Sequence, residues 1–280
     1  MAKTIFLDVD GTLVDYHNRV PESAIEAITQ ARANGHRIFL VTGRSKSESY
    51  DELMTIGFDG YIGGNGSYVE ADGEELFHQT LSLEEATSII DWLKNRGLEY
   101  YVEANTGLFA SENFAERGKP VMMEYIGRKG QEIPAHFEVT DAMPDLLLDR
   151  ADEGYRDDVN KISFILDSYA DFEAAREHFS AYKVGTWGGH GETALFGDMA
   201  LPNIDKAVAI DKLINLLGIA QADTMAFGDA KVDIPMLEYS AVGIAMGNGG
   251  PEIKAMADYI TSPVDEDGLY QAFQHFGLLD

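Results

Sequence analysis

A short apolar run near the start of the chain, followed at once by two aspartates and a glycine, constrains the fold most strongly. Residues 4–7 (TIFL) carry no charge and precede Asp8, Asp10 and Gly11. A run of this length beside turn-forming residues predicts a strand buried on both faces, as in a parallel sheet. A spacing of two in extended backbone places the two carboxylates on one side, where their repulsion favours binding of a cation such as a metal ion. The alternative for this segment alone is an ordinary acidic turn after a strand.

Both ends of the chain alternate between apolar runs and amphipathic segments. Helices are predicted over 21–34, 45–56, 205–217, 233–238 and 251–257, and strands over 36–41, 224–227, 241–246 and 259–261, with a short strand and a hairpin over 61–77. Strand–helix–strand alternation requires right-handed crossovers and a parallel sheet. The two ends therefore predict one α/β domain with a doubly wound parallel sheet.

The middle of the chain lacks this regular alternation. Helices are predicted over 82–96, where Ser82 and Glu85 have capping-box spacing, and over 113–129 and 170–182, with strands over 98–103, 160–167, 183–187 and 193–196. Residues 143–156 are acidic and stay unassigned. We therefore expect an α+β domain over 81–189, inserted between two parts of the α/β domain at 1–80 and 190–280.

Composition excludes several classes of protein. The formal net charge of -27 disfavours nucleic acids and anionic membranes as partners, and it means that any phosphate ligand needs a local cation. The absence of cysteine rules out disulfides, thiolate metal sites and a cysteine nucleophile. No secretory signal and no apolar run of about 18 residues is found, so the expected location is cytoplasmic.

Polar side chains follow four predicted strands, at the edge where ligands bind in open α/β sheets. They are Asp8 and Asp10, Thr42-Gly43-Arg44, Gly228-Asp229 and Gly247-Asn248. Lys206 lies near the start of a helix, and Asp233 follows Asp229 by one helical turn. Carboxylates, one lysine and loop amides suit Mg²⁺ with a phosphate beside it, whereas the seven scattered histidines do not have zinc-ligand spacing.

These residues resemble a known family. Asp8-Val9-Asp10-Gly11-Thr12, Val41-Thr42-Gly43-Arg44, Asp205-Lys206 and Gly228-Asp229-Ala230-Lys231-Val232-Asp233 match, in order, the four motifs of the haloacid dehalogenase (HAD) superfamily. The insertion between the second and third motifs resembles the C2 cap of its Cof-type (subfamily IIB) sugar and nucleotide phosphatases. Asn65-Gly66-Ser67 and residues 245–249 and 266–269 are similar to further Cof-type signatures. The resemblance implies a Rossmann-like core with an α+β cap.

The resemblance also implies a reaction and a role for each residue. The reaction is Mg²⁺-dependent hydrolysis of small phosphomonoesters, with Asp8 as the nucleophile that becomes an aspartyl-phosphate. Asp10 would be the general acid and base, and Lys206 would neutralise charge on the nucleophile and the phosphoryl group. Phosphate would be bound by Thr42, Gly43, Lys206 and Asn248, and the metal by Asp8, Asp10, Asp229 and Asp233. We expect a monomer or homodimer whose partner is a small phosphorylated metabolite, with no nucleic acid and no membrane.

One departure from the family pattern leaves other functions open. The family usually has asparagine before the last aspartate of the fourth motif, and Val232 stands there, which predicts weaker metal binding. The alternatives are a catalytically weak member that binds a phosphorylated ligand, a sugar phosphomutase, and a phosphate-responsive receiver module. Arg44 is interpreted as facing solvent. Five polar residues of the insertion are interpreted as ordinary surface residues rather than as residues that set substrate specificity: Glu103, Asn105, Arg117, Glu124 and His190.

Overall fold

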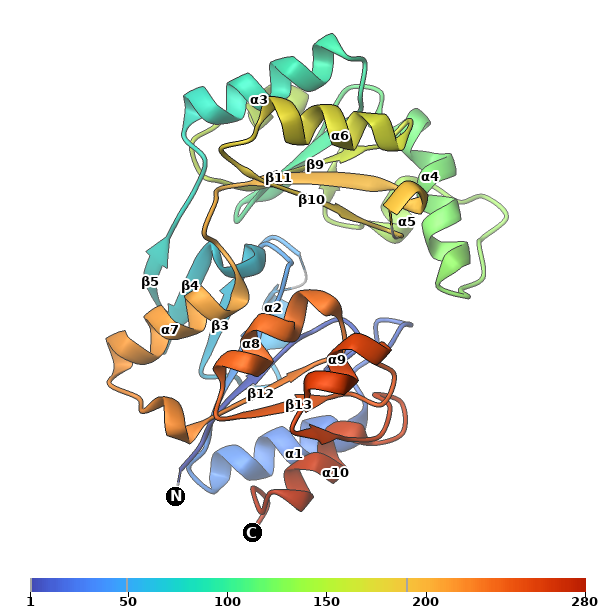
Figure 1. Ribbon diagram of the computed structural model, residues 1–280. Coiled ribbons are helices and arrows are strands. Elements are labelled where there is room, and N and C mark those ends of the chain that lie inside the picture. The colour runs from blue at the N-terminus through green and yellow to red at the C-terminus, as the bar shows by residue number, and fades with distance from the viewer. Residues whose placement is uncertain (1, 49, 190) are drawn as a thin grey trace. The chain divides into compact units, whose positions relative to one another are not determined.

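The computed structural model describes residues 2–48, 50–189 and 191–280, and it divides into two compact units (Figure 1). The first, here called the core unit, comprises Met1–Arg44, Tyr50–His78 and Ile204–Asp280. The second, here called the inserted unit, comprises Ser45–Ser49 and Gln79–Asn203. Each unit is described by itself below.

The core unit is built on a sheet that has eight strands among the described residues. Their order is β14 (Tyr259–Ile260), β13 (Val242–Ala245), β12 (Thr224–Gly228), β1 (Thr4–Leu7), β2 (Arg37–Val41), β3 (Gly60–Gly63), β4 (Tyr68–Ala71) and β5 (Glu74–His78). Neighbours from β14 to β3 run parallel, whereas the β3–β4 and β4–β5 pairs are antiparallel. The predicted parallel sheet is therefore confirmed, with β1 among its central strands.

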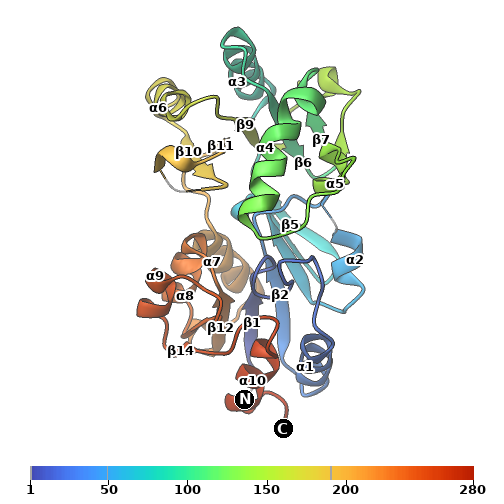
Figure 2. The ribbon, with the colours of Figure 1, turned by 90° about the vertical axis from the view of Figure 1, so that its right-hand side faces the viewer.

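Helices cover both faces of this sheet (Figure 2). They are α1 (Glu22–Ala33), α2 (Tyr50–Met54), α7 (Lys206–Leu217), α8 (Ile234–Tyr239), α9 (Pro251–Met256) and α10 (Gly268–His275), with 3₁₀ turns η1 (Gly64–Gly66), η4 (Gln221–Asp223) and η5 (Lys231–Asp233). Alternation along β1 explains the two layers: Ile5 and Leu7 pack with α1 and α10, whereas Phe6 packs with α7 and α8. A strand buried on both faces needs the continuous apolar run that the sequence shows.

Helix α7 has chemical signals at both of its ends. The Asp205 carboxylate accepts a hydrogen bond from the Val208 amide at 2.8 Å, which satisfies one of the free N–H groups of the first turn. Gly218 ends the helix in the left-handed conformation, with φ 67°. These signals place Lys206 in the first turn of the helix.

The inserted unit contains a second sheet, with six strands among the described residues. Their order is β10 (Lys183–Trp187), β11 (Phe196–Ala200), β9 (Val159–Ile165), β6 (Tyr100–Ala104), β7 (Gly107–Ala110) and β8 (Leu146–Leu147). Helices α3 (Leu83–Asn95) and α6 (Tyr169–His178) pack on one face, and α4 (Phe114–Arg128) and α5 (Val139–Ala142) pack on the other. Short 3₁₀ turns are η2 (Ala151–Gly154) and η3 (Gly191–Thr193). No helix of the described residues is long and apolar enough to cross a membrane.

Several predicted boundaries were wrong. The strand expected over 193–196 is β11, which lies further along the chain and pairs with both β9 and β10, so residues to Asn203 belong to the inserted unit rather than to the core. Residues 143–156 contain β8 and η2, and neither β7 nor α10 was expected. By contrast, the predicted capping box of α3 is present, with Ser82 and Glu85 bonded reciprocally.

The helix predicted over 45–56 is restricted to α2, because its first residues are bonded elsewhere. The Ser45 hydroxyl accepts a hydrogen bond from the Asn160 side chain at 2.9 Å, and the Ser47 hydroxyl donates to the Ala104 carbonyl at 2.8 Å. The Lys46 amide donates to the Asn105 side chain at 3.2 Å. Serine side chains that bond outside the segment compete with helix formation, and these bonds place the segment in the inserted unit.

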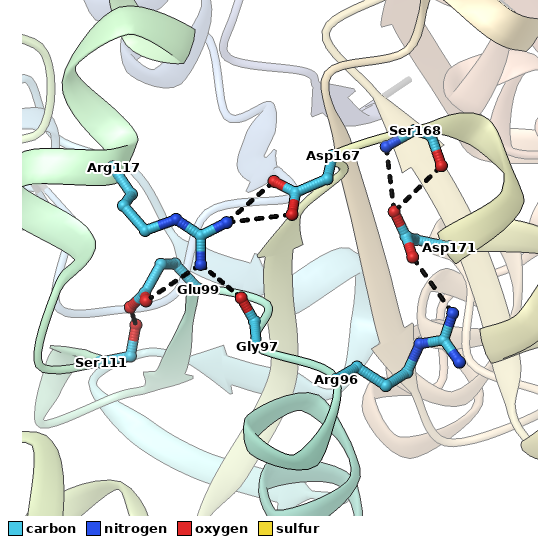
Figure 3. A network of polar contacts seen from close by, with 8 residues as sticks. All are labelled: Arg96, Gly97, Glu99, Ser111, Arg117, Asp167, Ser168 and Asp171. Atoms are coloured by element: carbon cyan, nitrogen blue, oxygen red, sulfur yellow. Dashed lines mark hydrogen bonds and ion pairs between the residues drawn. The ribbon is translucent and has the colours of Figure 1, made fainter.

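Polar residues of the inserted unit that were interpreted as ordinary surface residues mostly have defined partners. Arg117 binds both oxygens of Asp167 at 3.0 Å and also contacts Glu99, as Figure 3 shows. Glu103 is only 1% exposed, and its carboxylate pairs with Lys161 at 3.2 Å. Of the others, Asn105 has the contact described above, Glu124 is exposed and pairs with Arg128, and His190 lies outside the described residues.

Two buried serines provide a test of the packing. The Ser67 hydroxyl is buried and has no hydrogen-bond partner among the described residues. By contrast, the Ser111 hydroxyl donates to Glu99 at 2.5 Å (Figure 3). It also accepts a hydrogen bond from the Tyr100 amide. An unpaired buried hydroxyl costs about 1–3 kcal/mol. We expect Ser67→Ala to leave the thermal midpoint unchanged or raise it, and Ser111→Ala to lower it. Thermal melts of both variants check this, and a larger loss for Ser67→Ala would contradict it.

Candidate active site

Three carboxylates from separate parts of the sequence meet at one edge of the core sheet. Asp8 directly follows β1, and Asp229 directly follows β12, the parallel neighbour of β1. Asp233 closes the η5 turn after β12. Each of these residues offers a carboxylate oxygen, and the three oxygens lie within 4.8 Å of one another.

Lys206 lies between two of these carboxylates. Its Nζ atom is 2.5 Å from Asp8 Oδ1 and 2.5 Å from Asp233 Oδ1, and the residue is 2% exposed. Burial alone would lower the lysine pKa, but the two carboxylates outweigh it and raise that pKa above its ordinary value. Lys206 therefore stays protonated and contributes a fixed positive charge.

Asp233 also fixes the loop that carries Asp229. Its second oxygen accepts hydrogen bonds from the Asp229 amide at 3.2 Å and the Ala230 amide at 2.9 Å. Gly228 makes this arrangement possible, because a Cβ atom there would lie 2.5 Å from the Asp233 Cβ. The sequence Gly228-Asp229 is thus required by close packing as well as by chemistry.

The electrostatics of this cluster favour an additional cation. Burial, followed by the charge of Asp233, raises the pKa of Asp8 well above its usual range and that of Asp229 to about 7. Three ionised carboxylates and one ammonium leave an excess of two negative charges, which one divalent cation would balance. Asp229 Oδ1 is buried without a hydrogen-bond partner in the described part of the chain. An all-oxygen donor set with such an orphaned atom fits a hard ion such as Mg²⁺.

Gly11 lies in the loop next to the carboxylate cluster, at a position that cannot accommodate a side chain. Its φ of +88° is a conformation that other residues rarely adopt, and a Cβ atom there would overlap the Asp229 carboxylate. The loop after β1 can therefore approach Asp229 only with glycine at this position.

Asp10 pairs with Arg44, which corrects the interpretation of Arg44 as a solvent-facing residue. The guanidinium donates from Nε to one Asp10 oxygen at 3.0 Å and from Nη2 to the other at 2.6 Å. The Arg44 side chain is 19% exposed. A bidentate pair of this kind orients the carboxylate as well as binding it. Arg44 is thus a site residue that the sequence analysis missed, although its position directly after Gly43 was a signal.

The Thr42–Gly43 pair lies at the end of β2, the other parallel neighbour of β1. Thr42 is fully buried, and its hydroxyl oxygen accepts a hydrogen bond from the Arg44 amide at 3.1 Å. This bond turns the chain after Thr42, close to the carboxyl end of β1. The structure therefore brings Thr42, Gly43, Asp8 and Lys206 to the same edge of the sheet.

The side chain of Asn248, which is predicted to contact phosphate, makes hydrogen bonds within the core unit. Its side-chain amide donates to the Gly11 carbonyl at 2.8 Å and to the Tyr16 hydroxyl at 3.2 Å, and its carbonyl accepts from the Val264 amide at 2.9 Å. Both polar atoms are thus engaged within the protein, so Asn248 holds the Gly11 loop. The side chain of Val232 is largely exposed, so this position offers the cluster no polar group.

Comparisons with known proteins agree with this arrangement. A family model described as haloacid dehalogenase-like hydrolase matches residues 5–273. YkrA of Bacillus subtilis (strain 168), named provisionally as a phosphatase, is 29% identical over 99% of both chains. The solved structure of the HAD subclass IIB sugar phosphatase BT4131 has a TM-score of 0.76 and 28% identity, covering 99% of this chain and all of that one. BT1666 from Bacteroides thetaiotaomicron, a HAD phosphatase, has a TM-score of 0.76 and 26% identity, with 99% and 96% covered. The chain therefore belongs to the haloacid dehalogenase-like hydrolase family, with an α/β core and an inserted cap.

Proposed function

We propose that this chain is a magnesium-dependent phosphomonoesterase that forms an aspartyl-phosphate on Asp8. The observation that carries the proposal is the position of Lys206 between Asp8 and Asp233, beside Asp229 Oδ1, which has no hydrogen-bond partner among the described residues. Phosphoryl transfer depends mainly on positioning and on neutralising charge, and this cluster supplies both.

Each step uses a residue already described. Asp8 Oδ attacks phosphorus, a P–O bond forms to the carboxylate, and the bond to the leaving alkoxide breaks. Asp10 donates a proton to that alkoxide and then accepts one from the water that hydrolyses the intermediate. Thr42 and the Gly43 amide bind phosphoryl oxygens, and Lys206 compensates the negative charge that accumulates near Asp8.

The metal would be held by Asp8, Asp229 and Asp233, together with the Asp10 carbonyl. A bound Mg²⁺ would supply electrostatic stabilisation to the phosphoryl oxygens and offset the repulsion between them and Asp8. The three carboxylate oxygens lie within 4.8 Å of one another, which is close enough for one ion to contact all three.

The substrate class is a small phosphorylated metabolite. BT4131 is described as a sugar phosphatase, and YitU of Bacillus subtilis is named a 5-amino-6-(5-phospho-D-ribitylamino)uracil phosphatase. Both support a small polar phosphomonoester, in agreement with the strong net negative charge of this chain, which disfavours nucleic acid. We also propose that the enzyme is cytoplasmic. The inserted unit, which includes residues 79–203, would be its C2-type cap.

Phosphate release from an aryl phosphate tests the proposal. We expect turnover with Mg²⁺ and at least about a 10²-fold loss after chelation, because metal charge stabilisation contributes several kcal/mol. Absence of phosphate release with Mg²⁺ from a panel of aryl, sugar and nucleoside phosphates would contradict it. The weak-binder alternative, which rests on Val232, predicts ligand binding without release, and a phosphomutase predicts an isomerised sugar phosphate instead of free phosphate.

The raised pKa of Asp229 predicts how Mg²⁺ changes stability with pH. Its pKa is about 7 in the folded protein against an ordinary 3.8, so the metal-free folded state retains a proton that the unfolded state releases. The stability from this group is complete below about pH 4 and is lost as the pH rises through 7. Mg²⁺ replaces that proton, so it should raise the thermal midpoint by about 5–10 °C at pH 8 when its concentration is 100 times Kd.

The same measurement near pH 5 should show a much smaller shift, because the proton then competes with the metal. Asp229→Asn is the control, and it should remove the Mg²⁺-dependent shift at both pH values. Equal shifts at pH 5 and pH 8 in the unmodified protein would contradict the coupling.

A further inference from the structure

The η1 turn is unusual because all three of its residues have left-handed backbone. Gly64 has φ 57°, Asn65 has φ 55° and Gly66 has φ 105°. Glycine adopts this region readily, whereas any residue with a Cβ atom pays a steric cost there, even asparagine, which tolerates it best. Glycine at the middle position would avoid this cost, so the presence of asparagine there points to a role for its side chain.

On one side, the turn holds both ends of the loop Thr42–Arg44. The Asn65 amide donates to the Thr42 carbonyl at 3.0 Å, and the Gly64 amide donates to the Arg44 carbonyl at 2.8 Å. Consecutive left-handed residues direct these two N–H groups to the same side of the turn. The loop proposed to bind phosphate is thus fixed by backbone bonds at its first and last residues.

The Asn65 carboxamide covers the middle of the same loop. Its Oδ1 atom lies 3.2 Å from the position that a Cβ of Gly43 would occupy, so it packs directly against the Gly43 backbone. Within the described residues no hydrogen bond holds this carboxamide. It therefore restricts Gly43 by contact, at the amide that the proposed mechanism uses.

On its other side, the turn packs against the start of α7. A Cβ on Gly66 would overlap the Asp205 carbonyl and lie 3.0 Å from the Ala209 Cβ. Asp205 is the N-cap of α7, and Lys206 follows it. The turn thus lies between the loop Thr42–Arg44 and the helix that carries the buried lysine.

We propose that Asn65 is a positioning residue that holds Gly43 for phosphate binding, and that the η1 turn sets the spacing between this loop and Lys206. The inference rests on the proposed function, because it assigns phosphate to Thr42 and Gly43. It adds a residue outside the metal cluster on which phosphate affinity depends.

The Asn65→Gly variant removes the side chain but keeps the backbone of the turn, so it tests the contribution of the side chain alone. Glycine keeps the backbone bonds and relieves the left-handed strain, so the thermal midpoint should stay the same or rise. Loss of the carboxamide contact should raise the inhibition constant of inorganic phosphate, and the KM of an aryl phosphate, at least about fivefold. Asn65→Asp keeps the shape but adds a negative charge, so it should weaken phosphate binding further. Asp72→Gly is the control for the two kinetic readouts, because Asp72 is also left-handed, with φ 54°, but lies in the β4–β5 hairpin, where it pairs with Arg37.

The outcomes distinguish this inference from the proposed function. An Asn65→Gly variant with unchanged phosphate inhibition and KM overturns the positioning role, even if the unmodified protein is an active phosphatase. If the unmodified protein shows no turnover, phosphate binding measured by its effect on the thermal midpoint replaces the inhibition constant, and equal binding by both proteins overturns the role. An unmodified protein that neither turns over nor binds inorganic phosphate overturns both proposals.

Discussion

Replacing Asp8 by asparagine should reduce phosphomonoester hydrolysis by at least about 10³-fold while leaving the protein folded. Asparagine has nearly the same shape, but its amide cannot attack phosphorus to form a stable acyl-phosphate. It also removes one of the carboxylates that Lys206 only partly neutralises. The metal-free variant should therefore melt at the same or a higher temperature than the unmodified chain. Rates measured at saturating Mg²⁺, together with thermal melts, check both parts.

The covalent intermediate gives this test a second readout. Acid quenching of the unmodified protein during turnover should trap a phosphoryl group on the peptide containing Asp8, and Asp8→Asn should trap none. Asp51→Asn, which changes an exposed aspartate in the first turn of α2, should behave like the unmodified chain in both assays. Near-normal turnover in Asp8→Asn would end the proposed mechanism.

Replacing Lys206 by methionine should have the second large effect, on stability as well as on rate. Its ammonium contacts two buried carboxylates at 2.5 Å, and removing one partner of a buried charge pair costs about 3–5 kcal/mol. We expect a thermal midpoint lower by about 6–20 °C in metal-free buffer at pH 8, and a loss of most hydrolysis. Melts and steady-state rates measure both.

A double variant separates the two effects. Adding Asp233→Asn to Lys206→Met removes one of the repelling carboxylates, so part of the stability should return while activity stays absent. Lys3→Met is the matched control, because the Lys3–Asp223 pair is partly exposed and such pairs contribute about 0–1 kcal/mol. A Lys206→Met chain that melts and turns over normally would show that the buried ammonium is unimportant.

The sequence predicted those features of the fold that depend on residues close together in the chain. The β1 strand was readable because burial on both faces demands an uninterrupted apolar run. The start of α3 was readable because Ser82 and Glu85 lie one turn apart and bond to each other. The edge at which Asp8 and Asp229 lie followed from the rule for parallel sheets. The positions of these carboxylates were therefore predictable from order and spacing.

Contacts between distant residues decided the rest. Ser45 reads as the start of a helix, but its partner Asn160 is 115 residues away and draws it into the inserted unit. The sequence did not show that the Asn248 side chain donates a hydrogen bond to the Gly11 carbonyl, which is 237 positions earlier. The sequence around Arg44 predicts an exposed side chain, but in the fold this side chain forms an ion pair with Asp10. Such pairings depend on the finished fold, so no local pattern could reveal them.

The division of the chain into units has a practical consequence for dissecting this protein into fragments. Residues 79–203 look like a continuous piece that could be expressed alone, but the inserted unit also includes the short stretch after Arg44. A fragment without that stretch would leave the Asn160 side chain without Ser45 and the Ala104 carbonyl without Ser47. A gene fusion or domain exchange would therefore need to transplant two separate pieces of sequence, one of them only a few codons long.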